Sequence, residues 1–445
     1  MNDTIAAIST PFGEGALAVL RLSGPRSVEI ARAVFRGKFP PPRCVAFGAI
    51  FDGERKLDDV LLTAFAAPHS YTGEDVVEIS CHGGVLVTRR ILEALLRLGA
   101  RSAEPGEFTQ RAFLYGKLDL TQAEAVMDLI GAQTDLALRA ATEQLEGRLG
   151  ERIRALREAL IEMLAHVEAF IDFPDEDIDP ETGGALRARL DALRADVAKL
   201  LDTAEQGRVL REGVRTVIYG APNVGKSSLL NRLLGFERAI VSTKPGTTRD
   251  VIEEVINLRG IPLRLVDTAG VRESEDEVER EGMARTQQQV ERADLVLHIA
   301  EAHRAPFDQF SGLALDSFAG ASRVLLILNK SDLGEHRDWR RMDAVRVSCT
   351  TGQGMDALTA AIEAKVFGGA VHRDWTVAIN ARHQSCLERA RGFLEAASGG
   401  FDAGLSAEFI AEELRAALDA VGEIVGKADV EELLGVIFQR FCIGK

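Results

Sequence analysis

Short apolar runs alternate with helical patterns in the first part of the chain. The β-type runs are Thr4–Ile8, Ala16–Leu22, Leu61–Ala66 and Val76–Ser80, and helical periodicity appears near Val28–Phe35 and Val85–Leu98. Strands and helices in alternation bury their apolar faces against one another. The pattern predicts one compact α/β domain over residues 1–118.

From about Leu120 the apolar residues recur every three or four positions. One stripe consists of Leu149, Ile153, Leu156, Leu160, Leu164, Val167 and Ile171. This spacing places the stripe on one face of a long helix, as in a bundle core. Helical patterns continue over 185–211, Leu387–Ala397 and Ala407–Phe438. We therefore expect residues 119–213 and 371–445 to form one discontinuous helical domain, with residues 214–370 inserted in it.

The inserted segment opens with a phosphate-binding pattern. The loop G-A-P-N-V-G-K-S, residues 220–227, follows the apolar run Val214–Tyr219 and precedes a helical pattern that begins at Ser228. Between a strand and a helix, such a loop cradles phosphate oxygens with its backbone N–H groups. Lys226 can reach the β and γ phosphates, and Ser227 can offer a hydroxyl to Mg²⁺. The segment therefore predicts a nucleotide triphosphatase with a Ras-like P-loop domain.

Two further segments are suited to sensing the γ-phosphate. Asp267-Thr268-Ala269-Gly270 follows the apolar run Leu263–Val266, so its aspartate can hold Mg²⁺ through water. The stretch Gly246-Thr247-Thr248-Arg249-Asp250 precedes it, where a mobile switch would supply a threonine hydroxyl. We expect Thr248 to be that Mg²⁺ ligand.

The base is predicted from a third motif. Asn329-Lys330-Ser331-Asp332 follows the apolar run Val324–Leu328, and its aspartate can accept both N1–H and the exocyclic amine of guanine. Adenine lacks this donor pair, so GTP is the expected nucleotide. Ser348-Cys349-Thr350 could complete the base pocket, although it departs from the usual Ser-Ala-Lys of GTPases.

The residue that orients water in Ras-like enzymes is absent from its usual place. Val271 follows the D-T-A-G motif where such enzymes have glutamine, and an apolar side chain cannot polarise water. The acidic stretch 273–279 is the nearest supply of carboxylates.

Composition narrows the possible partners and location. Lys and Arg total 53 against 68 Asp and Glu, a net charge of −15, so any RNA contact must be local or shared with another protein. The N-terminus has no positive n-region and no apolar run is long enough to span a bilayer. We expect a cytoplasmic protein that makes no membrane contact. The five scattered cysteines favour neither a disulfide framework nor a zinc site.

The motifs converge on one family. The chain resembles the MnmE (TrmE) tRNA modification GTPases over essentially its whole length. Besides the GTPase motifs, the resemblance rests on residues 70–75 (S-Y-T-G-E-D), 105–109 (P-G-E-F-T), 116–120 (G-K-L-D-L), 173–177 (F-P-D-E-D) and 442–445 (C-I-G-K). It implies a multidomain α/β plus α fold, with an N-terminal domain like the family's tetrahydrofolate-binding domain.

The resemblance also implies the site residues. GTP would contact Asn223, Val224, Gly225, Lys226, Ser227, Ser228, Ser242, Thr243, Lys244, Pro245, Gly246, Thr247, Thr248, Asp267, Thr268, Ala269, Gly270, Asn329, Lys330, Ser331 and Asp332. Ser227 and Thr248 would hold Mg²⁺, while K⁺ would take oxygens from Asn223, Ser242, Lys244 and Thr247. Lys226 would be catalytic, and Glu279 would orient the attacking water through a bridging water.

The family's chemistry implies further ligands and partners. Arg21, Glu78, Lys117 and Lys445 would bind 5-formyltetrahydrofolate or 5,10-methylenetetrahydrofolate, and Cys442 would assist the transfer chemistry. A homodimer would join the FAD protein MnmG in a heterotetramer. Together they would install an aminomethyl or carboxymethylaminomethyl group on C5 of the wobble uridine of tRNA.

Other interpretations remain open on the residues alone. A regulatory or ribosome-assembly GTPase would use the same GTPase motifs, and so would a stress-response scaffold. Neither requires the N-terminal motifs, Cys442 or Lys445. Cys442 could also be a small buried hydrophobe, and His82 is expected to be structural because it has no partners at metal spacing.

Overall fold

The computed structural model describes residues 3–172, 183–235, 254–266, 288–306, 309, 323–367, 378–426, 437–438 and 441–444. Its contacts divide the chain into two compact units. Unit 1 comprises Met1–Met127, Leu145–Ile178 and Ser406–Lys445, and unit 2 comprises Asp128–Gln144 and Asp179–Leu405. Each unit is described separately below.

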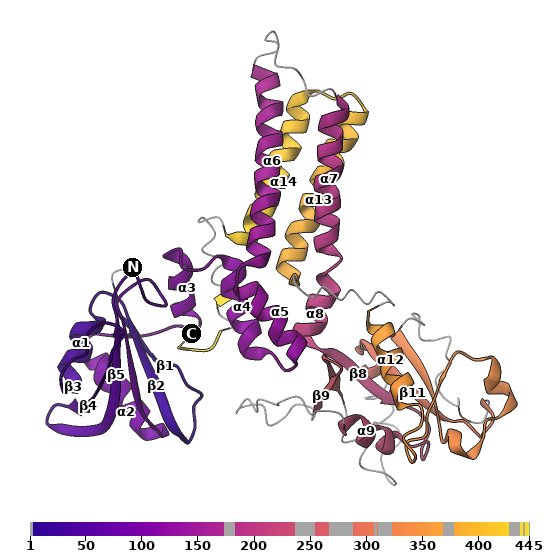
Figure 1. The fold of residues 1–445 in the computed structure, drawn as a ribbon, viewed down its shortest axis with the longest axis horizontal. Helices are drawn as coiled ribbons and strands as arrows, with labels where there is room; N and C mark the ends of the chain where they lie inside the picture. The colour runs from indigo at the N-terminus through magenta and orange to yellow at the C-terminus, as the bar shows by residue number, and fades with distance from the viewer. Residues whose placement is uncertain are drawn as a thin grey trace. The chain divides into compact units, whose positions relative to one another are not determined.

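Unit 1 begins with a seven-stranded sheet of order β3-β4-β5-β6-β2-β1-β7 (Figure 1). The strands are β1 (Ile5–Ile8), β2 (Gly15–Ser23), β3 (Phe35–Arg36), β4 (Val45–Asp52), β5 (Arg55–Phe65), β6 (Val76–Gly83) and β7 (Arg101–Ser102). Only the β1–β7 pair is parallel, so the expected α/β alternation here builds a mainly antiparallel sheet.

One face of this sheet carries the helices α1 (Ser27–Val34) and α2 (Val85–Arg97). Side chains alternate between the faces of a strand, so Leu20, Leu22 and Ile79 enter the core while their neighbours point the other way. That other face is apolar and exposed at β2, β4 and β5. The exposed fractions are 68% for Leu17, 72% for Phe47 and 46% for Leu61.

The helices of unit 1 include α3 (Glu107–Leu114), α6 (Arg148–Asp172) and α14 (Ala407–Val425), and α4 (Leu120–Gly131) begins in it. The predicted stripe on α6 is largely buried, including Leu149, Ile153 and Leu160. α6 packs along α14, and Arg415 of α14 makes an ion pair with Glu168 of α6 at 2.7 Å. The apolar faces of two segments far apart in sequence therefore cover each other.

In unit 2, a second helix pair packs beside a nucleotide-binding fold. Its helices are α5 (Asp135–Leu145), α7 (Gly183–Leu201), α8 (Ala204–Glu212) and α13 (Ala381–Asp402), and α7 packs on α13. Arg211, just before the inserted segment, donates a hydrogen bond to the carbonyl of Ile379, just after it, at 2.5 Å. This contact supports an insertion with neighbouring ends, while the exact domain boundaries stay a prediction.

The inserted segment contains a six-stranded sheet of order β13-β12-β11-β8-β10-β9. Its strands are β8 (Val214–Tyr219), β9 (Glu254–Leu258), β10 (Ile261–Leu265), β11 (Leu295–Glu301), β12 (Val324–Asn329) and β13 (Val345–Arg346). All neighbouring pairs are parallel except β9 with β10. The helices α9 (Lys226–Leu234) and α12 (Met355–Val366) contribute Leu229, Leu233 and Leu358 to its core.

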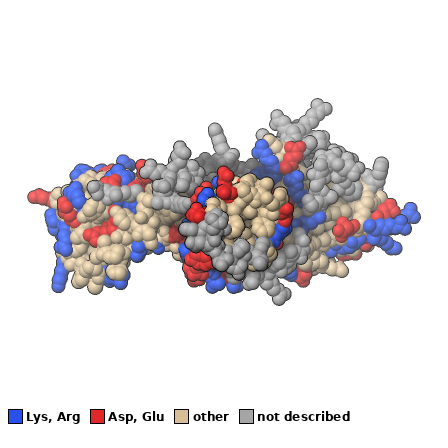
Figure 2. Space-filling model, turned by 90° about the horizontal axis from the view of Figure 1, so that it is seen from above, with Lys and Arg blue, Asp and Glu red and all other residues tan. Residues whose placement is uncertain are grey.

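Charged side chains of both signs lie at the surface of the described parts (Figure 2). On the face seen in Figure 2, basic and acidic side chains are interspersed over the described parts. No helix in the described ranges has both the length and the apolar character needed to cross a membrane.

Candidate functional site

The P-loop lies at the carboxyl end of β8, where parallel sheets place their ligands. It ends at Gly225, whose φ of 102° favours glycine, and α9 begins at Lys226. A Cβ atom on Gly225 would lie 2.2 Å from Nδ2 of Asn329. Glycine is therefore required here both by the backbone conformation and by the close approach of Asn329.

Lys226 lies on the loop that its sequence motif predicts. Its Nζ donates to the carbonyls of Gly220 and Ala221, both at 2.9 Å. Burial lowers the pKa of Lys226. Asn223, in the same loop, is exposed and has a left-handed φ of 64°.

The N-K-S-D motif at the carboxyl end of β12 is bonded directly to the P-loop. The carboxamide of Asn329 donates to the carbonyl of Val224 at 2.9 Å and accepts from the amide of Cys349 at 3.1 Å. Lys330 donates to the carbonyl of Asn223 at 3.0 Å. Asp332 is exposed, so its carboxylate is accessible to a base. The motif thus joins the phosphate loop to the edge where guanine is expected.

The Ser-Cys-Thr segment lies beside this motif despite its departure from the usual sequence. Ser348 and Cys349 are buried. Burial raises the pKa of the Cys349 thiol to about 11, so the thiol stays neutral. Arg232 of α9 donates to the carbonyls of Cys349 and Thr350, at 2.7 Å and 2.8 Å. The segment is held by its backbone, which explains why the side-chain departure is compatible with the loop.

Sequence reasoning missed two residues of this site, Arg232 and Glu301. Glu301 is 4% exposed at the end of β11, and its carboxylate makes a short ion pair with Lys330. The contacts that place them in this site join distant segments, since Lys330 is 29 residues from Glu301 and Cys349 is 117 residues from Arg232. An isolated acid at the end of the apolar run 295–300 was the only sequence signal for Glu301.

Several predicted ligands lie outside the described residues. They are Ser242, Thr243, Lys244, Pro245, Gly246, Thr247, Thr248, Asp267, Thr268, Ala269, Gly270, Glu279 and Lys445. Their roles stay predictions.

Two of the predicted folate ligands contact each other. Arg21 of β2 and Glu78 of β6 are direct cross-strand neighbours, with Nη2 of Arg21 2.6 Å from Oε1 of Glu78. The guanidinium carbon of Arg21 lies 5.3 Å from the centre of the Tyr71 ring. Both charged side chains point to the sheet face that α1 and α2 leave uncovered, because they alternate with the buried residues of their strands.

Lys117 makes a different contact. Its Nζ donates to the carbonyl of Pro68 at 3.1 Å. Lys117 also lines an open cavity of about 470 Å³, together with Asp119, Gln122 and Arg154 among others.

The C-terminal segment packs on the N-terminal part of unit 1. The Gly106 amide donates to the carbonyl of Cys442 at 3.4 Å, and the Ser9 hydroxyl donates to the carbonyl of Gly444 at 3.1 Å. Cys442 is exposed, so the interpretation of this residue as a small buried hydrophobe is wrong.

His82 has a structural partner. Its Nδ1 lies 2.7 Å from Oδ1 of Asp58, and its amide donates to Oδ2 of the same residue at 2.8 Å. Within the described residues, no cluster of three or more His, Cys, Asp or Glu side chains could hold a metal ion.

Comparison with known proteins identifies the family. The family model "GTP-binding protein TrmE N-terminus" matches residues 4–117, and "MnmE helical domain" matches residues 120–442. A protein from Akkermansia muciniphila, named "tRNA modification GTPase MnmE", is 51% identical over 99% of both chains. One of the same name from Geobacillus kaustophilus is 47% identical over 100% of this chain and 99% of its own. The chain belongs to the MnmE family of tRNA modification GTPases.

The solved structures add little to MnmE membership. The FeoB G-domain from Methanococcus jannaschii is 28% identical, and the match covers 34% of this chain and 97% of that one. Its TM-score is 0.26. The motifs and full-length relatives carry the assignment.

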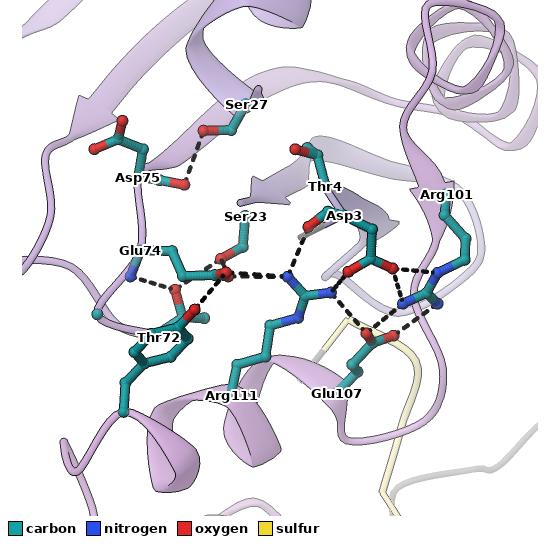
Figure 3. Close-up of polar contacts among 12 residues, drawn as sticks. Asp3, Thr4, Ser23, Ser27, Thr72, Glu74, Asp75, Arg101, Glu107 and Arg111 are labelled. Carbon is teal, nitrogen blue, oxygen red and sulfur yellow. Dashed lines mark hydrogen bonds and ion pairs between the residues drawn. The ribbon is translucent and has the colours of Figure 1, made fainter. Parts of the chain in front are cut away.

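Two motifs shared with the MnmE family meet around one buried arginine (Figure 3). Arg111 is fully buried, and it donates to Glu74 of S-Y-T-G-E-D at 3.0 Å and to Glu107 of P-G-E-F-T at 2.9 Å. Asp3 and Arg101 extend the network. Burial alone would raise the pKa of Glu107, but hydrogen bonds from Arg101, the Glu104 amide and Arg111 hold it below its usual value. These motif carboxylates therefore stabilise the N-terminal part of the fold.

Proposed function

We propose that the chain is a K⁺-stimulated, Mg²⁺-dependent GTPase whose hydrolysis cycle drives modification of the tRNA wobble uridine. The main support for GTP binding is Asn329, which is hydrogen-bonded to both Val224 and Cys349. It fixes the phosphate loop and the Ser-Cys-Thr segment on either side of Asn329, while Asp332 stays accessible for the N–H donors of guanine.

The described residues fit the two cations. Ser227 lies in the first turn of α9 and carries a hydroxyl oxygen of the kind that binds Mg²⁺ in P-loop proteins. The exposed amide of Asn223 offers a neutral oxygen beside the P-loop, which suits a weakly bound monovalent ion. A cation there would offset charge that develops during phosphoryl transfer. Thr248, Ser242, Lys244 and Thr247 would complete these ligand sets.

Hydrolysis also requires an oriented water. Val271 cannot supply a hydrogen bond, so we assign this role to Glu279, through a bridging water. Lys226 would hold the β and γ phosphates, because its Nζ already lies over the P-loop carbonyls.

The N-terminal domain would carry the one-carbon donor, 5-formyltetrahydrofolate or 5,10-methylenetetrahydrofolate. Glu78 can accept from the pterin's amino and ring N–H groups, and Arg21, Lys117 and Lys445 suit its acidic tail. The Arg21–Glu78 ion pair supports this assignment because it lies on the sheet face that α1 and α2 leave uncovered, with Arg21 beside the rings of Tyr71 and Phe108. The exposed thiol of Cys442 is accessible for a part in transfer.

We further propose a homodimer formed through this sheet face. Phe47 of β4 and Leu61 of β5 are direct cross-strand neighbours, and both are exposed. Val45 of β4 is 62% exposed and extends this apolar surface, and Leu17 of β2, 68% exposed, lies on the same face beyond the polar residues of β6. An apolar patch of this kind is typical of an interaction surface. The dimer would join the FAD protein MnmG in a heterotetramer, and MnmG would supply much of the RNA-binding surface that this acidic chain lacks.

The potassium proposal is tested by GTP hydrolysis in KCl and in NaCl at equal ionic strength. We expect hydrolysis to be at least about tenfold slower in NaCl, because Na⁺ is too small for a site that fits K⁺. Equal rates would contradict the K⁺ site and leave the GTPase assignment unaffected.

A further inference from the structure

Glu301 is a buried acid that the established GTPase motifs do not include. It ends β11 directly beside Asn329 of β12 in the register of the sheet. Its amide donates to Oε1 of Gln309 at 2.6 Å, which fixes its backbone. At 4% exposure, its carboxylate needs cationic partners to offset the loss of water.

Its main partner is Lys330 of the N-K-S-D motif. Oε1 of Glu301 makes a short contact with Nζ of Lys330. Oε2 lies 2.8 Å from Nε of Arg304 in an ion pair without hydrogen-bond alignment. Arg304 is 64% exposed, so solvent screens its charge more than that of Lys330, which is 33% exposed.

Lys330 also contacts the P-loop. The same ammonium donates to the carbonyl of Asn223 at 3.0 Å. Asn223 holds a left-handed φ of 64°, a conformation that asparagine adopts more readily than most residues other than glycine. The chain of contacts therefore runs from Glu301 through Lys330 to the residue whose side chain is assigned to K⁺.

The charge of Glu301 should also influence cation binding at Asn223. The Lys330 ammonium carries a full positive charge within hydrogen-bond distance of the Asn223 carbonyl. This charge would repel a cation that binds at Asn223. The carboxylate of Glu301 neutralises that ammonium. Without it, a monovalent cation at Asn223 would face an uncompensated charge.

We propose that Glu301 is a positioning residue that sets the potassium affinity of the GTPase by holding and neutralising Lys330. This inference rests on the proposed potassium site at Asn223. Glu301 touches neither the nucleotide nor the cation; it acts through Lys330 and the backbone of Asn223.

The test titrates the full-length native chain and Glu301→Gln with KCl at constant ionic strength, once by GTP hydrolysis at saturating GTP and once by displacement of bound Tl⁺, a K⁺ mimic, followed by thallium NMR. We expect the half-saturating K⁺ concentration to rise about fivefold in the variant, equivalent to about 1 kcal/mol. The rate at saturating K⁺ should recover. Structural damage alone would lower the maximal rate and leave the half-saturating concentration unchanged.

Two further variants keep the test decisive. Arg304→Ala removes a second ion pair of Glu301 and leaves the Lys330 contact, so its half-saturating concentration should stay within about twofold of native. Glu301→Asp keeps the negative charge, so its half-saturating K⁺ concentration should stay closer to native than that of Glu301→Gln. If the glutamine variant does not fold, Glu301→Asp is compared with the native chain instead.

The outcomes separate the two proposals. A native chain that responds to K⁺ together with an unshifted Glu301→Gln overturns the role of Glu301 alone. Equal shifts in Glu301→Asp and Glu301→Gln also overturn it, because charge would then not be the cause. A native chain with no K⁺ response contradicts the potassium site on which the inference rests.

Discussion

At the scale of single residues, we propose that guanine is recognised by one exposed carboxylate, that of Asp332. Asp332 follows the buried Asn329 and the half-buried Lys330, which are both bonded to the P-loop, while its own side chain is accessible. A carboxylate accepts two N–H donors from guanine, and a lost pairing of this kind costs about 1–3 kcal/mol.

Asp332→Asn should therefore weaken GTP binding by about tenfold to a hundredfold. It should also improve binding of xanthosine triphosphate, whose 2-oxo group accepts a hydrogen bond from the new amide. Competition against a fluorescent guanine nucleotide measures both. Asp338→Asn, at another exposed acid of the same domain, is the control and should bind GTP normally. Unchanged GTP affinity in Asp332→Asn would remove this residue from the base pocket.

A buried histidine makes the nucleotide-binding fold sensitive to acid. His298 of β11 is the register partner of Tyr219, the last residue of β8, with the ring centroids 5.3 Å apart. Burial lowers the pKa of His298 to about 4. The unfolded chain takes up a proton below about pH 6.5, whereas folded His298 resists protonation until about pH 4.

The free energy of unfolding should consequently fall as the pH drops from 6.5 towards 4. The contribution of His298 is about 2 kcal/mol between pH 8 and pH 5. Urea unfolding followed by the fluorescence of buried Trp339, in a Trp375→Phe background, measures it. His298→Gln should show a flatter pH dependence than its parent. Parallel pH curves for the two proteins would show that His298 does not carry this acid sensitivity.

At the scale of elements, the sheet face formed by β2, β4 and β5 should be a dimer interface. Phe47→Ser with Leu61→Ser removes two exposed apolar side chains that are cross-strand neighbours. Burying each side chain of this size contributes about 1.5–3 kcal/mol to the free energy of association. A two-fold symmetric interface contains each side chain twice, so the double variant would lose each contribution twice. We expect the dimer dissociation constant to rise at least about a hundredfold.

Analytical ultracentrifugation of the full chain measures this change. Leu333→Ser, at a 63% exposed leucine outside this sheet, is the matched control and should dimerise as the native chain does. Unaltered dimerisation in the double variant would place the interface elsewhere.

The elements differ in how far sequence could predict them. The P-loop was found because its chemistry is local: strand, glycines, lysine and helix are contiguous over 214–234. The long stripe of α6 was predictable for the same reason. β4 was missed because Gly48 interrupts a run whose outward residues, including Phe47, are apolar as well, so the polar alternation is absent.

Contacts between distant segments could not be predicted. Glu74 and Arg111 are separated by 37 residues, and Arg232 lies 117 residues from the carbonyl of Cys349. Nothing in the local pattern specifies such partners. In the sequence, the motifs containing Glu74 and Glu107 indicate only a family resemblance. Their physical role depends on Arg111, which is buried between them.

At the scale of the whole molecule, one chain of the MnmE family combines a P-loop fold with a separate N-terminal domain. Family models match both the N-terminal part and the long region that contains the helices, and the relatives match along the whole length. We propose that nucleotide hydrolysis in unit 2 is required for a tRNA modification that also uses the N-terminal domain.

Nucleoside mass spectrometry of bulk tRNA tests this claim most directly. Bacterial cells that lack their own copy of this protein are complemented with the native chain or with Lys226→Ala. We predict that C5-modified wobble uridine is lost in the deletion strain, returns with the native chain and stays absent with Lys226→Ala, because its P-loop has lost the lysine for the β and γ phosphates. Full modification in cells that make Lys226→Ala would show that modification does not require the P-loop lysine, and full modification in the deletion strain would show that it does not require this protein.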